Sequence, residues 1–180
     1  MNREGCVTHV HELLNAWNAR DLDAYVALLS PDVRWHDLAM ASPPAVGRDA
    51  VRHFCETILR AFPDFRYEIR APICVADDGN SCTVPWTITA THLGVLQPPG
   101  FTPTGRTLNM HGFDYIQFRD GQVANMESRF DPAEAIEQLM GVRLRPNPGS
   151  FAERCLVLLQ RIAANAVRRK RKADSHAGAI

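Results

Sequence analysis

The fold prediction rests on Val33-Arg34-Trp35-His36-Asp37, a short extended stretch that places a carboxylate among apolar residues. Side chains alternate along a strand, so Val33, Trp35 and Asp37 share one face while Arg34 and His36 share the other. A second acid, Asp114, lies in a similar apolar run over residues 111–118. A buried carboxylate without a partner costs several kcal/mol. The two acids are therefore the first place to look for chemistry.

The residues around this stretch predict helices before it and strands after it. Apolar residues at helical spacing predict a helix over residues 6–18 and a second that begins after Asp21 and ends at Ser30-Pro31. A loop over 41–47 precedes a third helix over about 49–62. Alternation and turn residues then predict strands over residues 65–75, 81–92, 106–119 and 122–130. A short helix begins at Asp131-Pro132 and ends at Gly141.

The carboxyl-terminal part is expected to form a separate appendage. We divide the chain into a domain over residues 1–142, a linker over 143–150, a helix over 151–172 and a tail over 173–180. The helix has an apolar stripe and ends in a basic run, 168–172. It could pack on the sheet, mediate a dimer or extend freely. Contact with a membrane surface is not favoured, because the polar face is read as basic at its end alone.

Charge and composition exclude several classes of function. The 180 residues are 46% hydrophobic and 22% charged, as in ordinary globular proteins. Residues 1–167 hold 15 basic and 19 acidic residues, a net charge of −4, which does not suit nucleic acid. Five scattered cysteines without paired spacing argue against disulfides and a zinc site. With no signal sequence and no apolar run long enough to span a membrane, we expect a cytoplasmic protein.

Helices followed by a curved antiparallel sheet that wraps around them indicate an α+β fold. The order of elements, with Ser30-Pro31-Asp32-Val33, resembles the nuclear transport factor 2-like superfamily. Within it, Thr91-His92-Leu93-Gly94 and the run 118–123 (FRDGQV) resemble motifs of the SnoaL-like polyketide cyclases, and the similarity covers residues 8–142. The resemblance implies a cone-shaped domain, here with an extra carboxyl-terminal helix. It also implies a small-molecule enzyme that needs no metal or redox cofactor.

The ketosteroid isomerases of the same superfamily suggest roles for both acids. Their resemblance to this chain implies that Asp37 transfers protons as a base and that Asp114 donates a hydrogen bond to an enolate oxygen. Such an acid stays protonated through burial and like-charge proximity. Two positions depart from the family patterns, because the isomerases' pocket tyrosine falls at Leu13 and the cyclases' aspartate on the last strand falls at Ser128. The alternative for each acid is a helix cap or an ion pair with a nearby arginine, which for Asp37 would be Arg34 or Arg48.

A third candidate for proton transfer is His92, which shares the apolar face of its predicted strand and could instead be a structural histidine. His36 and His111 should face away from the acids. An apolar cavity is expected to be lined by Trp17, Trp35, Phe54, Trp86, Phe113, Met126 and Phe130, and Ser128 to contact substrate. Residues 94–105 could form a lid over it, or an ordinary hairpin loop or dimer contact.

These observations predict a cofactor-independent cyclase of polyketide-type biosynthesis that acts on an apolar, oxygenated substrate by Asp/Asp acid-base catalysis. A ketosteroid-isomerase-like isomerase or dehydratase, or an epoxide-opening, ether-forming cyclase, is the alternative enzyme. A ligand-binding or protein-interaction module is the non-enzymatic alternative. We expect a homodimer with a small-molecule substrate and without nucleic acid or membrane partners.

Overall fold

The computed structural model describes residues 2–38, 44–97, 100–144 and 146–177. In the last helix the described side chains are those of residues 151–165 and Arg168. Part of the predicted loop 41–47, Pro98-Pro99 of the predicted lid and the end of the tail lie outside the described residues. By its contacts the chain divides into two units, residues 1–142 and 143–180, which are described separately below.

The amino-terminal unit begins with the helices α1 (Arg3–Ala19), α2 (Leu22–Ala27) and α3 (Arg48–Ala61). The Asn2 and Asp21 side chains accept hydrogen bonds from backbone N–H groups in the first turns of α1 and α2, which fixes both starts. The second helix was predicted to continue to Ser30-Pro31, and this is wrong. It ends at Leu28, because Leu29 already pairs with Val123 and its carbonyl accepts from the Arg48 guanidinium.

The strands form one curved, unclosed sheet. They are β1 (Leu29–Asp37), β2 (Ala45–Val46), β3 (Arg66–Ile69), β4 (Cys74–Val75), β5 (Ser81–Thr91), β6 (Thr107–Arg119) and β7 (Gln122–Phe130). The order is β2-β1-β7-β6-β5-β3, with β4 also on β5. Neighbours are antiparallel except β1 and β7, which run parallel. The predicted strand 65–75 is two short strands, because Pro72 between them cannot donate to a ladder.

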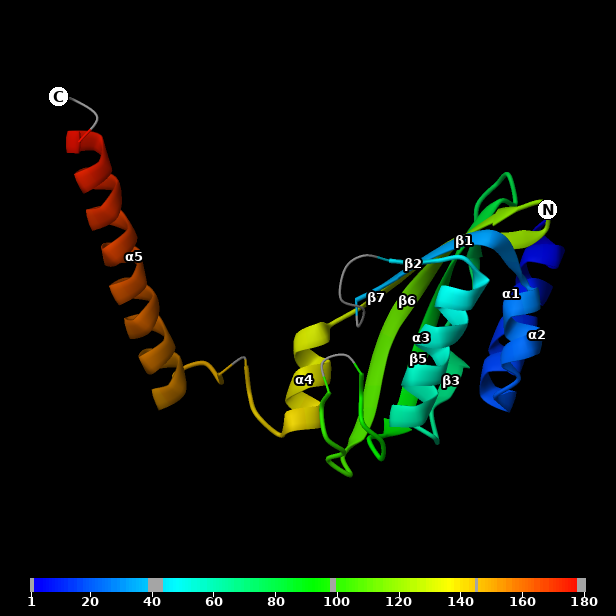
Figure 1. Cartoon of the computed structure of the whole chain (residues 1–180), viewed down its shortest axis with the longest axis horizontal. Helices are drawn as coiled ribbons and strands as arrows, with labels where there is room; N and C mark the ends of the chain where they lie inside the picture. The colour runs from blue at the N-terminus through cyan, green and yellow to red at the C-terminus, as the bar shows by residue number, and fades with distance from the viewer. Residues whose placement is uncertain (1, 39–43, 98–99, 145, 178–180) are drawn as a thin grey trace. The chain divides into compact units, whose positions relative to one another are not determined.

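The inner face of the sheet packs against the helices and forms the core. Figure 1 shows α1, α2 and α3 gathered on one side of the curved strands. Along β6, Met110, Asp114 and Ile116 are buried while His111 and Phe113 are exposed, as alternation predicts. The mixed architecture confirms the predicted α+β class. The short helix α4 (Pro132–Met140) follows β7 and ends at Gly141 with a left-handed backbone.

The second unit consists of the segment from residue 143 and a single helix, α5 (Phe151–Ala177). It is five residues longer than predicted, ending at 177 and not at 172. The Ser150 hydroxyl accepts from the Glu153 N–H and the Glu153 carboxylate from the Gly149 N–H, so the helix start is capped on both sides. In the part of the chain that is described, no helix has both the length and the apolarity to cross a membrane.

Candidate active site

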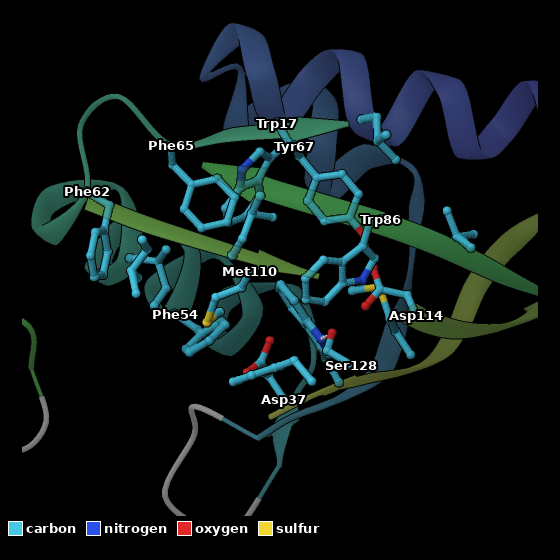
Figure 2. A pocket seen from close by; sticks show the side chains of 18 of the residues that line it. Trp17, Asp37, Phe54, Phe62, Phe65, Tyr67, Trp86, Met110, Asp114 and Ser128 are labelled. Carbon is cyan, nitrogen blue, oxygen red and sulfur yellow. Dashed lines mark hydrogen bonds between the residues drawn. The ribbon is translucent and has the colours of Figure 1, made fainter. Parts of the chain in front are cut away.

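Three polar side chains form a row across three neighbouring strands. Asp37 on β1 pairs in register with Ser128 on β7, and Ser128 pairs with Asp114 on β6. Paired residues in neighbouring strands point to the same face of a sheet, so all three side chains lie on the inner face. With strands about 4.8 Å apart, the α-carbons of Asp37 and Asp114 are separated by roughly 10 Å. Figure 2 shows Ser128 between the two acids.

The row opens on an apolar cavity between the sheet and the helices. Both acids and Ser128 line this cavity. All the predicted lining residues except Phe113 also line it, and they are Trp17, Trp35, Phe54, Trp86, Met126 and Phe130. Phe113 was expected here and is on the outer face, 44% exposed, because it is one residue out of step with Asp114. The cavity volume is about 150 Å³. Sites for drug-sized ligands hold about 300–1,000 Å³, so a substrate of several rings requires the walls to move.

Asp114 is the more buried of the two acids, 7% exposed. Its Oδ2 accepts a hydrogen bond from the Tyr67 hydroxyl. Burial raises the pKa of the carboxyl, and hydrogen bonding with Tyr67, Ser128 and Trp86 acts more weakly in the opposite direction. Among the described residues, Oδ1 lacks a well-formed hydrogen bond, as does the Trp86 indole nitrogen. Asp114 thus holds a proton to higher pH than an ordinary aspartate and has one oxygen available for a ligand.

Asp37 lies in a different environment at the end of β1, where it is half-buried. The Arg48 guanidinium donates to the Leu29 and Ala27 carbonyls, and an ion pair with Asp37 stays an alternative. Arg34 is exposed and, by alternation, on the opposite face of β1. One cavity therefore contains a deeply buried carboxyl and a second that is closer to solvent.

Ser128 is held by Trp35, its diagonal neighbour in the sheet. The Trp35 indole N–H donates to the Ser128 Oγ at 3.0 Å, and both side chains are buried. The Ser128 hydroxyl in turn hydrogen-bonds with Asp114 and lowers the pKa of that carboxyl. Ser128 therefore separates the two acids with a neutral group that can contact an oxygenated ligand.

Two tyrosines of the cavity were missed from the sequence. Tyr67 on β3 reaches Asp114, and its ring packs 5.6 Å from that of Trp86. Asn18 fixes Tyr67 by two hydrogen bonds to its backbone, 2.8 Å to the carbonyl and 2.9 Å from the N–H. Tyr25 on α2 also lines the cavity, and burial followed by the charges of Cys55, Asp114 and Asp37 raises its pKa well above the ordinary value. The alternating residues 65, 67 and 69 were the available signal for Tyr67.

The structure places His92 outside the cavity lining. It directly follows β5, fully buried, with its ring stacked on Phe62 at 5.2 Å. Nδ1 lies 3.3 Å from the Thr104 hydroxyl, and burial lowers the pKa of the imidazole, which favours the neutral ring. Its backbone N–H donates to Arg106 and its carbonyl accepts from Gly105. His92 thus anchors the segment that follows β5 and is not positioned for proton transfer in the cavity.

Metal ligation was assessed over the described residues, which contain no group of three or more His, Cys, Asp or Glu side chains placed to hold an ion. The expectation that the reaction needs no cofactor stays a prediction.

A family match from the sequence and several similar solved structures both relate this chain to SnoaL-like proteins. The family described as SnoaL-like domain matches residues 10–126. No curated protein matches the chain. AclR, a candidate hydroxylase from Streptomyces galilaeus, is a similar solved structure (TM-score 0.66, 24% identity, 94% of this chain and 97% of that chain). A candidate SnoaL-like polyketide cyclase from Jannaschia sp. CCS1 superimposes with a TM-score of 0.69 at 19% identity (78% and 94%).

A further similar structure is that of IdmH, a candidate polyketide cyclase from Streptomyces antibioticus, with a TM-score of 0.62 and 23% identity. It covers 76% of this chain and 99% of that chain. At these identities the solved structures support the fold, and the family match supports the identification of the domain.

Proposed function

Because the chain belongs to the SnoaL-like domain family, we propose that it catalyses ring closure on an apolar, oxygenated substrate of the polyketide type. Several structurally similar proteins are described as candidate polyketide cyclases. The single observation that carries the proposal is the row of Asp37, Ser128 and Asp114 on the wall of one apolar cavity. Two acids in unlike surroundings provide a base and an acid within reach of one ligand.

In the proposed reaction Asp37 acts as the base and Asp114 as the hydrogen-bond donor. The Asp37 carboxylate takes a proton from a carbon next to a ketone, and the C–H electron pair forms an enolate. Protonated Asp114 donates from Oδ1 to the enolate oxygen while Oδ2 accepts from Tyr67. The enolate carbon then bonds to a second carbonyl carbon, and the alkoxide formed takes the proton back from Asp37. Each group ends in its starting state.

The serine at position 128 affects which residue can act as the base. The resemblance to polyketide cyclases places an aspartate at this position, and here the side chain is a hydroxyl that accepts from Trp35. A serine cannot act as the base at neutral pH without an activating partner. The proton transfer is therefore assigned to Asp37, and Ser128 to binding an oxygen of the substrate.

The proposal is tested by comparing Asp37→Asn and Asp114→Asn with wild type in turnover and in ligand binding. The chain has three tryptophans, and all three line the cavity, so their fluorescence reports occupancy directly. We expect either substitution to lower turnover by about 10²- to 10⁴-fold, the usual contribution of a positioned acid or base. Binding should change far less. Asp77→Asn, in the exposed turn after β4, is the matched control.

A carrier protein would give the opposite pattern, with ligand-dependent quenching of the tryptophans and no turnover in the wild type. Turnover that persists in both variants would rule out the Asp/Asp mechanism and favour another route to ring closure or isomerisation.

A further inference from the structure

The carboxyl-terminal unit has a charge opposite to that of the rest of the chain. Residues 1–142 hold 11 basic and 18 acidic residues, a net charge of −7. Residues 143–180 hold 9 basic and 2 acidic residues, a net charge of +7. The formal charge of zero for the whole chain therefore conceals a strongly basic segment. Such asymmetry is typical of chains with a second, anionic partner.

The α5 helix has one broad apolar face. At 100° per residue, the described apolar side chains lie within an arc of about 160°, except Val157 and Ala164, which lie outside it. The large residues inside the arc are between 52% and 82% exposed: Phe151, Leu156, Leu158, Leu159 and Ile162. A coiled-coil partner would cover a narrower seam, and the two heptad series that begin at Phe151 and Cys155 stop being apolar at Asn165 and Arg169, short of the three to four heptads that indicate a coiled coil. The width of the face fits a flat apolar surface better than another helix.

The opposite face of α5 is cationic along its length. Arg154, Arg161 and Arg168 are spaced seven residues apart and lie within about 40° of one another on the helix. The expectation that positive charge is confined to the end of the helix is therefore wrong, because Arg154 and Arg161 precede the basic run over residues 168–172. Over residues 151–172 the sequence has seven basic residues and one acid, Glu153, which caps the helix start.

We propose that α5 binds an anionic lipid surface, lying in the plane of the interface with its apolar face in the acyl boundary and its arginines on the headgroups. A helix with a broad apolar face, an arginine-rich polar face and low overall hydrophobicity has the features of interfacial helices. Clusters of basic residues on such helices select anionic lipids. Residues 143–150 tether the helix to an acidic domain that an anionic surface repels.

The test uses the full chain and two kinds of vesicle, phosphatidylcholine alone and phosphatidylcholine mixed with phosphatidylglycerol. Co-sedimentation is expected with the anionic vesicles and not with the neutral ones. Leu158→Gln with Ile162→Gln should weaken binding by at least about tenfold, because apolar area is lost from the interface. Arg154→Gln and Arg161→Gln should each weaken it about fivefold. Val157→Gln, on the polar face of the same helix, is the matched control and should bind like wild type.

Three outcomes would overturn the proposal. The first is that the wild-type chain sediments with neither kind of vesicle. This result would contradict the proposal both if α5 is free and if it packs against its own chain. The second is concentration-dependent self-association that Leu158→Gln with Ile162→Gln abolishes while vesicles stay unbound, which would assign the apolar face to a second copy. The third is binding to anionic vesicles and to DNA alike that ignores the apolar substitutions, which would indicate charge attraction alone. Circular dichroism of each variant verifies that the helix is retained.

Discussion

Asp114 is a buried carboxyl, and its surroundings include one neighbour that the sequence did not reveal, Tyr67. Alternation along β6 correctly predicted that Asp114 faces inward with Met110 and Ile116. Tyr67 was missed because it lies 47 positions away along the chain and meets Asp114 only through the pairing of β3 with β5 and β5 with β6. Alternation gives the face of a residue, whereas its contacts across the sheet depend on register.

Tyr67→Phe tests how Asp114 is tuned. The hydrogen bond from Tyr67 stabilises the charged carboxylate and so lowers the pKa of Asp114, although burial outweighs this effect. If protonated Asp114 is the active form, turnover falls as pH rises through its pKa. Removing the Tyr67 hydroxyl raises that pKa, so the alkaline limb of the pH-rate profile should move to higher pH.

The control for this experiment is Tyr115→Phe, which removes a hydroxyl from β6 outside the cavity. It should leave the profile in place. An alkaline limb that stays fixed or moves to lower pH in Tyr67→Phe would mean that Asp114 does not act in its protonated form.

The strands position the row formed by Asp37, Ser128 and Asp114. The sequence predicted most of the helices and strands but not how all of the strands pair. The helices and the long strands could be predicted because their apolar periodicity is strong. The parallel pairing of β1 with β7 was missed, since nothing local distinguishes a parallel neighbour from an antiparallel one. That pairing brings Asp37 beside Ser128 and so into one row with Asp114. The sequence could name the two acids, but only the sheet topology shows that they share a cavity.

Gly112 on β6 packs closely against the backbone of β7 and the Trp86 ring, which lines the cavity. A Cβ at this position would lie 2.3 Å from the Arg129 carbonyl oxygen and 2.7 Å from the Trp86 ring. Gly112→Ala should therefore lower the free energy of unfolding by about 1–3 kcal/mol, the usual cost of overpacking. Displacing Trp86 should also weaken ligand binding, which tryptophan fluorescence would report.

Thr107→Ala, at an exposed position of the same strand, is the control and should change stability by less than about 0.5 kcal/mol. Urea unfolding measures both. A Gly112→Ala protein as stable as wild type would show that the wall at Trp86 yields without cost.

The molecule as a whole combines a domain that could be predicted from its sequence with an appendage for which we propose a lipid partner on the basis of charge and exposure. The SnoaL-like fold and the α+β class were recognisable because several motifs occur in order over most of the chain. The size of the cavity was not, because it depends on how side chains from separate elements fill the space between the helices and the sheet. The cavity volume is about 150 Å³, so a ligand of several rings would enter only if the walls opened.

The most direct test of paired acid-base catalysis is the turnover of wild type, Asp37→Asn, Asp114→Asn and the double variant on one substrate. Independent sites roughly 10 Å apart would contribute separately, so their losses would multiply. Groups that serve one step behave as a unit, and removing the second costs little once the first is gone. We predict that the double variant is about as slow as the slower single variant. Losses that multiply, or a single variant with wild-type turnover, would contradict the shared mechanism.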